Sequence, residues 1–241
     1  MPRTPVWKSI AETLSEEIAK GHYRPGDKLP TEAKLASRFG VNRHTVRHAL
    51  SDLTERGITR SRRGAGVFVQ SAPVEYPIGK RVRFHQNIRA TGRLPDKNVL
   101  RIETRPCDAT EAAALALSEG DEVLVYEGLS LSGGAPIAHF ISIFPTVRTP
   151  GLRAAFEEIS SVTEALKSIG IGDYIRAETR VSAERASTTQ ALHLNLRDGE
   201  PLLRTVSLNT TPDGTPIERG ITWFAGERVT LTVTPDSVTP G

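Results

Sequence analysis

The stretch Leu29–Val69 decides the fold of this chain, and it reads LPTEAKLASRFGVNRHTVRHALSDLTERGITRSRRGAGVFV. Thr31 is suited to cap a first helix that ends at Gly40, and Asn42 is suited to cap a second helix. Apolar residues recur at helical spacing in both segments: Leu35, Ala36 and Phe39, then Val46, Leu50 and Leu53. Two short helices joined by a glycine turn predict a helix-turn-helix.

A hairpin is predicted directly after the second helix. Gly57 ends that helix, and residues 58–60 and 67–69 are then able to pair around a tip at 61–66. The side of the second helix opposite its apolar stripe carries Arg43, His44, Arg47 and Ser51. This arrangement indicates a winged helix-turn-helix whose outer face is basic.

The charge distribution indicates what this unit binds. No acidic residue occurs between Glu32 and Asp52, nor between Glu55 and Glu75. Residues 1–72 hold 13 Lys/Arg against 7 Asp/Glu, a balance of +6, whereas the remainder carries −3 of the total of +3. A basic head on a mildly acidic body is typical of a DNA-binding domain attached to a sensor.

Length and composition narrow the class of protein. A chain of 241 residues with 38% hydrophobic residues predicts a soluble protein of about two domains. The single cysteine, Cys107, excludes an internal disulfide, and no apolar run suggests a membrane span or a signal peptide, so we expect a cytoplasmic protein. His44 and His48 have metal-ligand spacing but lie on the helix expected to face DNA. No metal, cofactor or catalytic residue is predicted.

Three spaced motifs carry a family resemblance. PGDKLPTE at 25–32, VNRHTVR at 41–47 and RGAGVFV at 63–69 resemble the winged-helix head of GntR-type bacterial repressors. One recognition helix covers too few base pairs for specificity, so we predict a homodimer that binds double-stranded DNA at a palindromic operator. The residues expected to contact DNA are Thr31, Glu32, Asn42, Arg43, His44, Thr45, Arg47, Arg62, Arg63, Gly64 and Gly66. Arg43 and Arg47 would read guanine edges or hold phosphates, and the sequence leaves both roles open.

The boundaries of the domains follow from these motifs. With a first helix over residues 5–20, the winged-helix domain spans 1–72, a proline-containing linker spans 73–79, and a second domain spans 80–241. At the start of the second domain, Arg81 and Arg83 precede or open a short helix that carries Phe84. This segment is either an anion site at a helix start or a solvated basic linker.

The second domain contains a diverged internal duplication. ETR at 103–105 recurs at 178–180, Gly120 corresponds to Gly199, and PI at 136–137 recurs at 216–217. Each copy has the pattern of a strand, a short helix, a glycine turn and a hairpin, and a helical insert at 149–170 separates the copies. We therefore predict an α+β domain with one antiparallel sheet, helices on one side of it, and a ligand pocket between the halves.

This layout is similar to the effector domain of the HutC subfamily, the UTRA domain, over about residues 80–235. That resemblance implies a chorismate-lyase-like fold. RVRF at 81–84, SVTEAL at 161–166 and DY at 173–174 are most similar to regulators of phosphonate metabolism. Members that sense sugar phosphates hold phosphate with an Arg-x-Arg, which here corresponds to Gly128 and Ser130. An anion would therefore need Arg81, Arg83 and Arg176.

Several of the candidate effector contacts also have a purely structural interpretation. His139 is as well suited to the core as to a pocket, Ser161 is also a helix N-cap, and Glu218 is also suited to an exposed strand position. The full set comprises Arg81, Arg83, Phe84, His139, Ser161, Thr163, Tyr174, Arg176 and Glu218. The expected effector is a small anion such as a phosphonate or a phosphate ester.

The resulting interpretation is a ligand-released repressor of genes for phosphonate or phosphorus-compound uptake and metabolism. Two alternatives remain open at this point. One is a HutC-type repressor that senses another metabolite, such as a sugar phosphate or an amino-acid derivative. The other is a small-molecule enzyme domain fused to a DNA-binding head, although the sequence contains no recognisable set of nucleophile and base.

Overall fold

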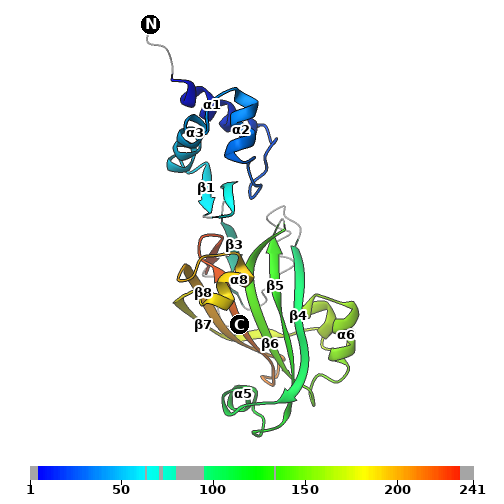
Figure 1. The fold of residues 1–241 in the computed structure, drawn as a ribbon. Coiled ribbons are helices and arrows are strands. Elements are labelled where there is room, and N and C mark those ends of the chain that lie inside the picture. The colour runs from blue at the N-terminus through cyan, green and yellow to red at the C-terminus, as the bar shows by residue number, and fades with distance from the viewer. Residues whose placement is uncertain (1–4, 63, 71–72, 80–94, 133, 234–241) are drawn as a thin grey trace. The chain divides into compact units, whose positions relative to one another are not determined.

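The computed structural model describes residues 5–62, 64–70, 73–79, 95–132 and 134–233. The chain divides into two compact units, residues 1–72 and 73–241 (Figure 1). The first unit is the head and the second is the sensor, and each is described by itself. The helix expected around Phe84 lies outside the described residues.

The head consists of three helices and a small hairpin. The helices are α1 (Val6–Ala19), α2 (Glu32–Phe39) and α3 (Arg43–Glu55), and β1 (Thr59–Arg62) pairs antiparallel with β2 (Gly66–Val69). The Thr31 hydroxyl accepts a hydrogen bond from the backbone N–H of Lys34 at 3.3 Å, and Asn42 accepts one from Thr45 at 2.8 Å. Gly40 ends α2 in the left-handed conformation, with φ 65°. The predicted helix-turn-helix and wing are therefore present.

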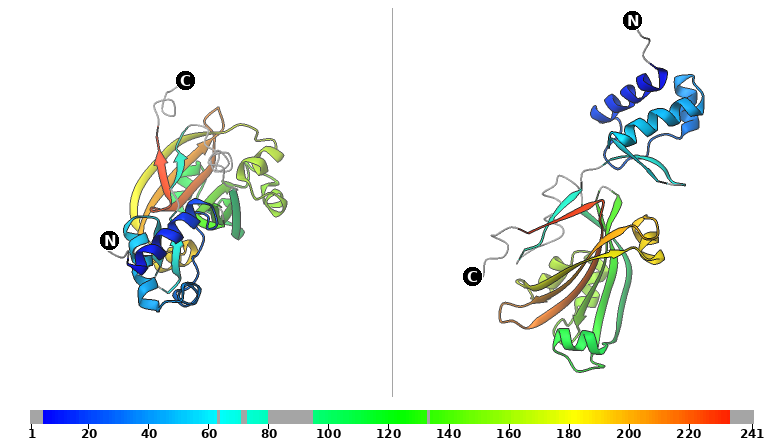
Figure 2. Two further views of the ribbon diagram at one scale, coloured as in Figure 1. Left: turned by 90° about the horizontal axis from the view of Figure 1, so that it is seen from above. Right: turned by 90° about the vertical axis from the view of Figure 1, so that its left-hand side faces the viewer.

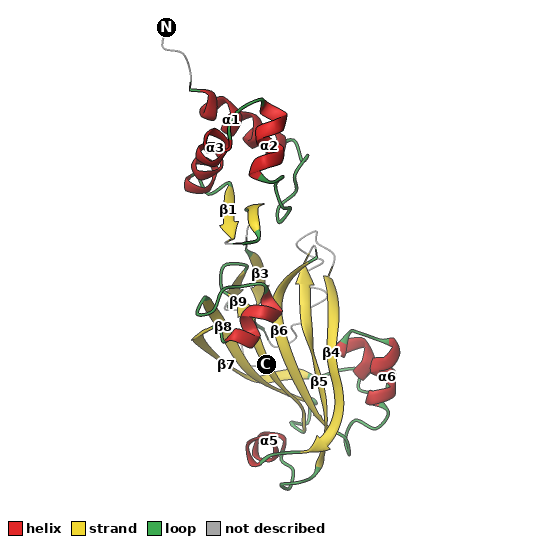
Figure 3. Ribbon diagram, viewed as in Figure 1, coloured by secondary structure: helices red, strands yellow, loops and turns green. Residues whose placement is uncertain are grey.

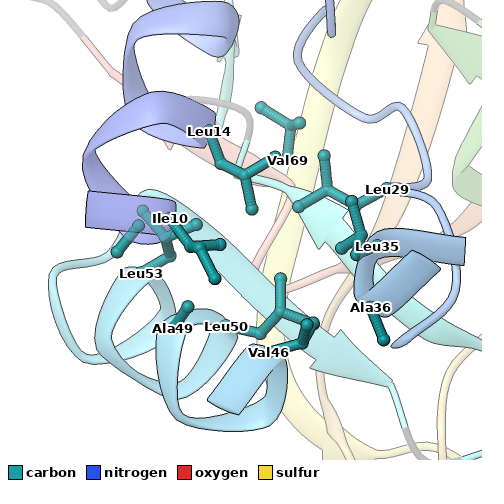
Figure 4. Packing of buried hydrophobic residues seen from close by; sticks show 11 residues of the cluster. Ile10, Leu14, Leu29, Leu35, Ala36, Val46, Ala49, Leu50, Leu53 and Val69 are labelled. Carbon is teal, nitrogen blue, oxygen red and sulfur yellow. The ribbon is translucent and has the colours of Figure 1, made fainter. Parts of the chain in front are cut away.

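One hydrophobic cluster holds the head together (Figure 4). All three helices, the wing and the segment before α2 contribute to it: Ile10, Ala11, Leu14, Leu29, Leu35, Ala36, Val46, Ala49, Leu50, Leu53 and Val69. The apolar stripe of α3 faces this cluster, so the polar face of the same helix is left in solvent.

The sensor is built around a six-stranded antiparallel sheet, visible in Figures 2 and 3, with the order β4-β5-β6-β9-β8-β7. Its strands are β4 (Pro95–Pro106), β5 (Glu122–Ser132), β6 (Ala135–Pro145), β7 (Ile175–Arg185), β8 (Pro201–Thr210) and β9 (Pro216–Ala225). Its helices are α5 (Ala109–Leu115), α6 (Leu152–Glu158), α7 (Val162–Ser168) and α8 (Thr188–Leu194). The antiparallel α+β class predicted from the sequence is confirmed.

The expectation that all helices lie on one side of the sheet is wrong. Tyr126 and Phe140 pack with α6 and α7, whereas Val125 and Ile143 pack with α5 on the opposite face. Successive residues of a strand point to opposite faces, and β5 and β6 are apolar on both. Burial of both faces therefore requires a helical layer on each.

The two copies of the duplication match in local detail. Helices α5 and α8 both begin with a capping box, formed by Asp108 with Glu111 and by Ser187 with Gln190. Both helices then end in a left-handed residue that is not glycine, Ala116 or Asn195.

An arginine at the end of each copy joins that copy to the other. Arg148 donates hydrogen bonds to Leu115 and Ala116 at the end of α5, at 2.5 and 2.7 Å, and to the carbonyl of Pro216 at 2.9 Å. Arg228 is buried, and it donates to the corresponding carbonyls, Leu194 at 2.6 Å, Asn195 at 3.0 Å and Pro136. The duplication thus extends from the strand order to individual side-chain contacts.

The segment expected to be a linker contains a strand. In the sensor, β3 (Val74–Pro77) pairs in parallel with β10 (Val229–Thr232), and Val74 and Tyr76 are buried against Phe224. Residues 73–79 therefore include part of the sensor core.

Candidate functional site

The outer face of α3 presents a row of polar side chains to solvent. Arg43, His44 and Arg47 are exposed, and Thr45 is half-buried beside Asn42. Because the N-terminal part of a recognition helix contacts base edges, these positions are suited to read DNA.

Glu32 holds the guanidinium of Arg47 in place. Its carboxylate accepts two hydrogen bonds from Arg47, at 3.0 Å from Nε and 2.7 Å from Nη2, which is a bidentate pair between α2 and α3. This pairing lowers the pKa of the Glu32 carboxyl below its usual value, although burial acts in the opposite direction. Arg47 is therefore oriented before any DNA is bound.

The other head residues expected to touch DNA have structural tasks as well. Thr31 and Asn42 cap α2 and α3. In the wing, Gly64 and Gly66 have φ of 77° and 110°, values that favour glycine, and a Cβ on Gly66 would lie 2.9 Å from Cε of Lys28. The side chain of Arg62 and all of Arg63 lie outside the described residues.

A cavity of about 100 Å³ lies in the sensor, on the sheet face that packs against α6 and α7. It is lined by β3, by strands of both copies and by the start of α7: Tyr76, Lys97, Ser130, Ala138, Phe140, Ser142, Ser161, Val162, Thr163, Tyr174, Arg176, Ser207, Asn209, Glu218, Gly220, Thr222 and Phe224. It is smaller than the roughly 150 Å³ engineered cavity that holds benzene, so it suits a compact ligand.

Lys97 brings a positive charge to this cavity. Its ammonium lies 4.6 Å from the centroid of the Phe140 ring and 5.4 Å from that of the Tyr126 ring. Burial lowers the pKa of Lys97 to about 8, while the negative charge of Glu218 acts in the opposite direction. Among the described residues, no carboxylate lies within 4.0 Å of this ammonium.

The second copy contributes the remaining charges. Arg176, Asn209 and Glu218 lie opposite one another on β7, β8 and β9. The Glu218 carboxylate is buried, with 6% of the residue exposed, and accepts a hydrogen bond of 2.7 Å from the Asn209 amide. Burial raises the pKa of the Tyr76 hydroxyl, and a hydrogen bond with Arg176 opposes this shift.

Two family models match the chain. One, described as bacterial regulatory proteins of the gntR family, covers residues 7–69, and one for the UTRA domain covers residues 90–230. The chain belongs to the GntR family, in its UTRA-containing branch. It is a transcriptional regulator with a DNA-binding head, and the sequence-based resemblance is confirmed.

Several relatives span almost the whole GntR regulator. The regulator RB1450 of Rhizobium meliloti is 32% identical, over 95% of this chain and 94% of its own. The probable transcriptional regulator PhnF of Escherichia coli is also 32% identical, over 94% of both chains. The solved structure of PhnF from Mycobacterium smegmatis has a TM-score of 0.65 at 23% identity, over 94% of this chain and 97% of its own, and this likeness shows the fold.

Five of the predicted effector contacts of this GntR regulator line the cavity: Ser161, Thr163, Tyr174, Arg176 and Glu218. The Thr163 and Tyr174 hydroxyls are hydrogen-bonded to each other at 2.8 Å. Ser161 also caps α7, because its hydroxyl accepts a hydrogen bond from the N–H of Glu164 at 3.4 Å. Arg81, Arg83 and Phe84 lie outside the described residues.

The placement of His139 in the effector pocket needs correction. Its ring stacks on Trp223 and meets His193 of α8, on the face of the sheet opposite the cavity, while its strand neighbours Ala138 and Phe140 line the cavity. Nε2 of His139 pairs with Glu127 at 2.9 Å, and burial lowers the pKa of the imidazole. His139 is a core residue of the GntR regulator's sensor.

The sequence-based prediction missed several polar lining residues, among them Lys97, Tyr76 and Asn209. Lys97 lies opposite Ser130 in the register of β4 and β5, so it supplies a cation beside one of the two positions at which the family resemblance would place the arginines of a sugar-phosphate sensor. Gly128 leaves no room for such an arginine, because a Cβ there would lie 2.7 Å from the Asn98 carbonyl oxygen. No local pattern marks Lys97, since its role depends on pairing across strands.

Within the part of the chain that the structure describes, no three His, Cys, Asp or Glu residues form a group suited to a metal ion. In the same part, no helix has both the length and the apolar character needed to cross a membrane.

Proposed function

We propose that this regulator is a repressor of genes for the uptake or metabolism of phosphonates or related phosphorus compounds, and that a small phosphorus oxyanion releases it from DNA. The observation that carries the proposal is the cavity, which combines the cationic Lys97 and Arg176 with several hydroxyl groups. Cations and hydroxyl donors are the groups that bind phosphoryl oxygens. The resemblance of SVTEAL at 161–166 and DY at 173–174 to regulators of phosphonate metabolism supports the same class of effector, and the chain is 32% identical to the probable transcriptional regulator PhnF of Escherichia coli.

The DNA-binding half of the proposal rests on α3 and the wing. Arg43, His44, Thr45 and Arg47 would enter the major groove, and Thr31, Glu32, Asn42, Arg62, Arg63, Gly64 and Gly66 would support or contact the backbone. One such helix reads few base pairs, so a homodimer on a palindrome follows. Equilibrium sedimentation at micromolar concentration is expected to give twice the chain mass, and a monomer would contradict it.

Tyr76 connects the cavity, along the chain, with the segment that directly follows the head. It lies on β3, only a few residues after the head ends at 72, and its ring is part of the cavity wall. A ligand that contacts Tyr76 or its partner Arg176 would bias the position of β3. The ligand shifts the DNA-binding equilibrium only by the difference in its affinity for the bound and released states.

Ligand-dependent release of DNA is the test of the proposed function. Phosphonates, inorganic phosphate, sugar phosphates and amino acids would be added to the purified protein on its operator, and anisotropy would be followed at fixed salt. We expect a phosphorus oxyanion to weaken binding about 5–150-fold, a coupling of about 1–3 kcal/mol. Release by sugars or amino acids alone would refute the effector class, and turnover of the ligand would favour an enzyme.

The affinity for the anion should depend on pH through Lys97. The pKa of Lys97 is lowered to about 8 by burial, so the ammonium is charged below pH 8 and loses its proton above it. A bound anion raises that pKa again, and affinity is therefore expected to fall by up to about tenfold per pH unit above pH 8. Isothermal titration calorimetry of wild-type and Lys97→Met proteins between pH 7.5 and 9.5 checks this, since the variant should lose the dependence.

A further inference from the structure

The cavity contains charges of both signs, and they are held apart. Lys97 and Glu218 both line it, and Glu218 is close enough to influence the pKa of Lys97. Both residues belong to the described part of the chain, yet their charged atoms form neither an ion pair within 4.0 Å nor a hydrogen bond. The half-buried cation and the buried carboxylate therefore do not pair directly with each other.

Glu218 is poorly compensated for a buried carboxylate. Among the described residues, its one hydrogen-bond donor is the Asn209 amide, which donates to Oε2 at 2.7 Å. A carboxylate has about four acceptor positions, and a buried charge is costly unless it is paired and hydrogen-bonded. A cationic donor from a ligand would supply the positive charge and the hydrogen bonds that the surrounding side chains do not.

Lys97 is in the complementary situation. Its ammonium contacts the faces of Phe140 and Tyr126, and its backbone neighbour across the sheet is Ser130, whose hydroxyl side chain also lines the cavity. The aromatic faces attract the ammonium electrostatically. They do not accept conventional hydrogen bonds from its three N–H groups, as an oxyanion would. This end of the cavity fits a group with several negative oxygens.

We propose that the effector is a zwitterion, a compact phosphorus oxyanion that also carries an ammonium group, with its oxyanion at Lys97 and its ammonium at Glu218. This inference rests on the proposed function and specifies its ligand. Among the described lining residues, the two positive charges of Lys97 and Arg176 and the single negative charge of Glu218 sum to +1. This complements the net charge of −1 on a dianionic oxyanion with one ammonium. The cavity of about 100 Å³ limits the spacer between the two groups to a few atoms.

A matched pair of ligands tests the proposal. Titration calorimetry of the full-length protein would compare 2-aminoethylphosphonate with ethylphosphonate, which lacks only the amine. We expect the aminated ligand to bind about tenfold more tightly or better, because a buried polar group left unpaired discriminates strongly against the analogue that lacks its partner. Equal affinity, or tighter binding of ethylphosphonate, would overturn the zwitterion and leave the phosphorus-oxyanion effector standing. Binding of neither ligand, nor of inorganic phosphate, would overturn both proposals.

Three variants test which residues discriminate between the two ligands. Glu218→Gln keeps the size of the side chain and an oxygen that accepts the hydrogen bond from Asn209. The affinities for the two ligands should then become about equal. Lys97→Met should weaken both ligands and leave their ratio above one. Glu178→Gln, at an exposed position on β7, removes the same charge and should change neither value. A Glu218→Gln protein that is folded by thermal unfolding and still prefers the amine would contradict the assignment.

Discussion

Replacing Arg228 by alanine is expected to lower the free energy of unfolding of the sensor by about 3–5 kcal/mol. Arg228 is 4% exposed, and its guanidinium donates to the carbonyls of Pro136, Leu194 and Asn195. Truncation would leave the end of α8 and the start of β6 without these donors and open a cavity. Urea unfolding followed by circular dichroism measures the loss, with the transitions of head and sensor fitted separately because a two-unit chain need not unfold in one step.

Arg148 provides the internal control for this variant. It makes the equivalent three hydrogen bonds at the end of α5 but is only half-buried, so water is able to replace part of what Arg148→Ala removes. We expect that variant to cost about 1–3 kcal/mol. Equal losses in the two variants would show that burial does not determine the cost of removing the arginine. No loss in either variant would show that these arginines do not stabilise the contact between the copies.

Replacing Arg47 by alanine is expected to weaken operator binding by about 1–3 kcal/mol, or roughly 5–150-fold. Arg47 is exposed on α3 and is already oriented by its bidentate pair with Glu32. A side chain held in place before binding loses less entropy in the complex, so its removal should be costly. Gel-shift titration at fixed salt measures the change.

Arg56→Ala is the matched control for the recognition helix. Arg56 follows the C-terminus of α3 and pairs with Asp52 at 3.0 Å, so it resembles Arg47 in its local ion pair and differs in its place on the helix. It should change the operator affinity by less than about 0.5 kcal/mol. An unchanged affinity in the Arg47 variant, or equal losses in both variants, would show that the N-terminal part of α3 does not read the operator.

The head could be predicted from sequence because its determinants are local. Thr31, Gly40 and Asn42 each act on backbone groups within four residues, and the apolar stripe of α3 repeats every three or four positions. The same holds for the duplication, whose glycine turns and hairpins recur at a near-constant offset. Such signals can be recognised in a short segment of the sequence without knowledge of the rest of the fold.

The composition of the effector cavity could not be predicted in the same way. Lys97 is brought opposite Ser130 by the register of β4 with β5, and Glu218 is brought beside Asn209 by the register of β9 with β8. A shift of one residue would turn each of these side chains to the opposite face, because strand neighbours alternate. His139 illustrates this: it adjoins two cavity residues in sequence and lies under α8.

The sequence by itself determined the winged helix, the class of the sensor fold and the family, since caps, periodicity and spaced motifs are short-range properties. The tertiary structure alone decided which face of each strand meets the cavity, that helices cover both faces of the sheet, and that Lys97, Arg176 and Glu218 share one space. Those outcomes depend on pairing and packing between segments as much as 121 residues apart, as for Lys97 and Glu218. Such pairings are selected by burial of the whole sheet, and no single segment encodes them.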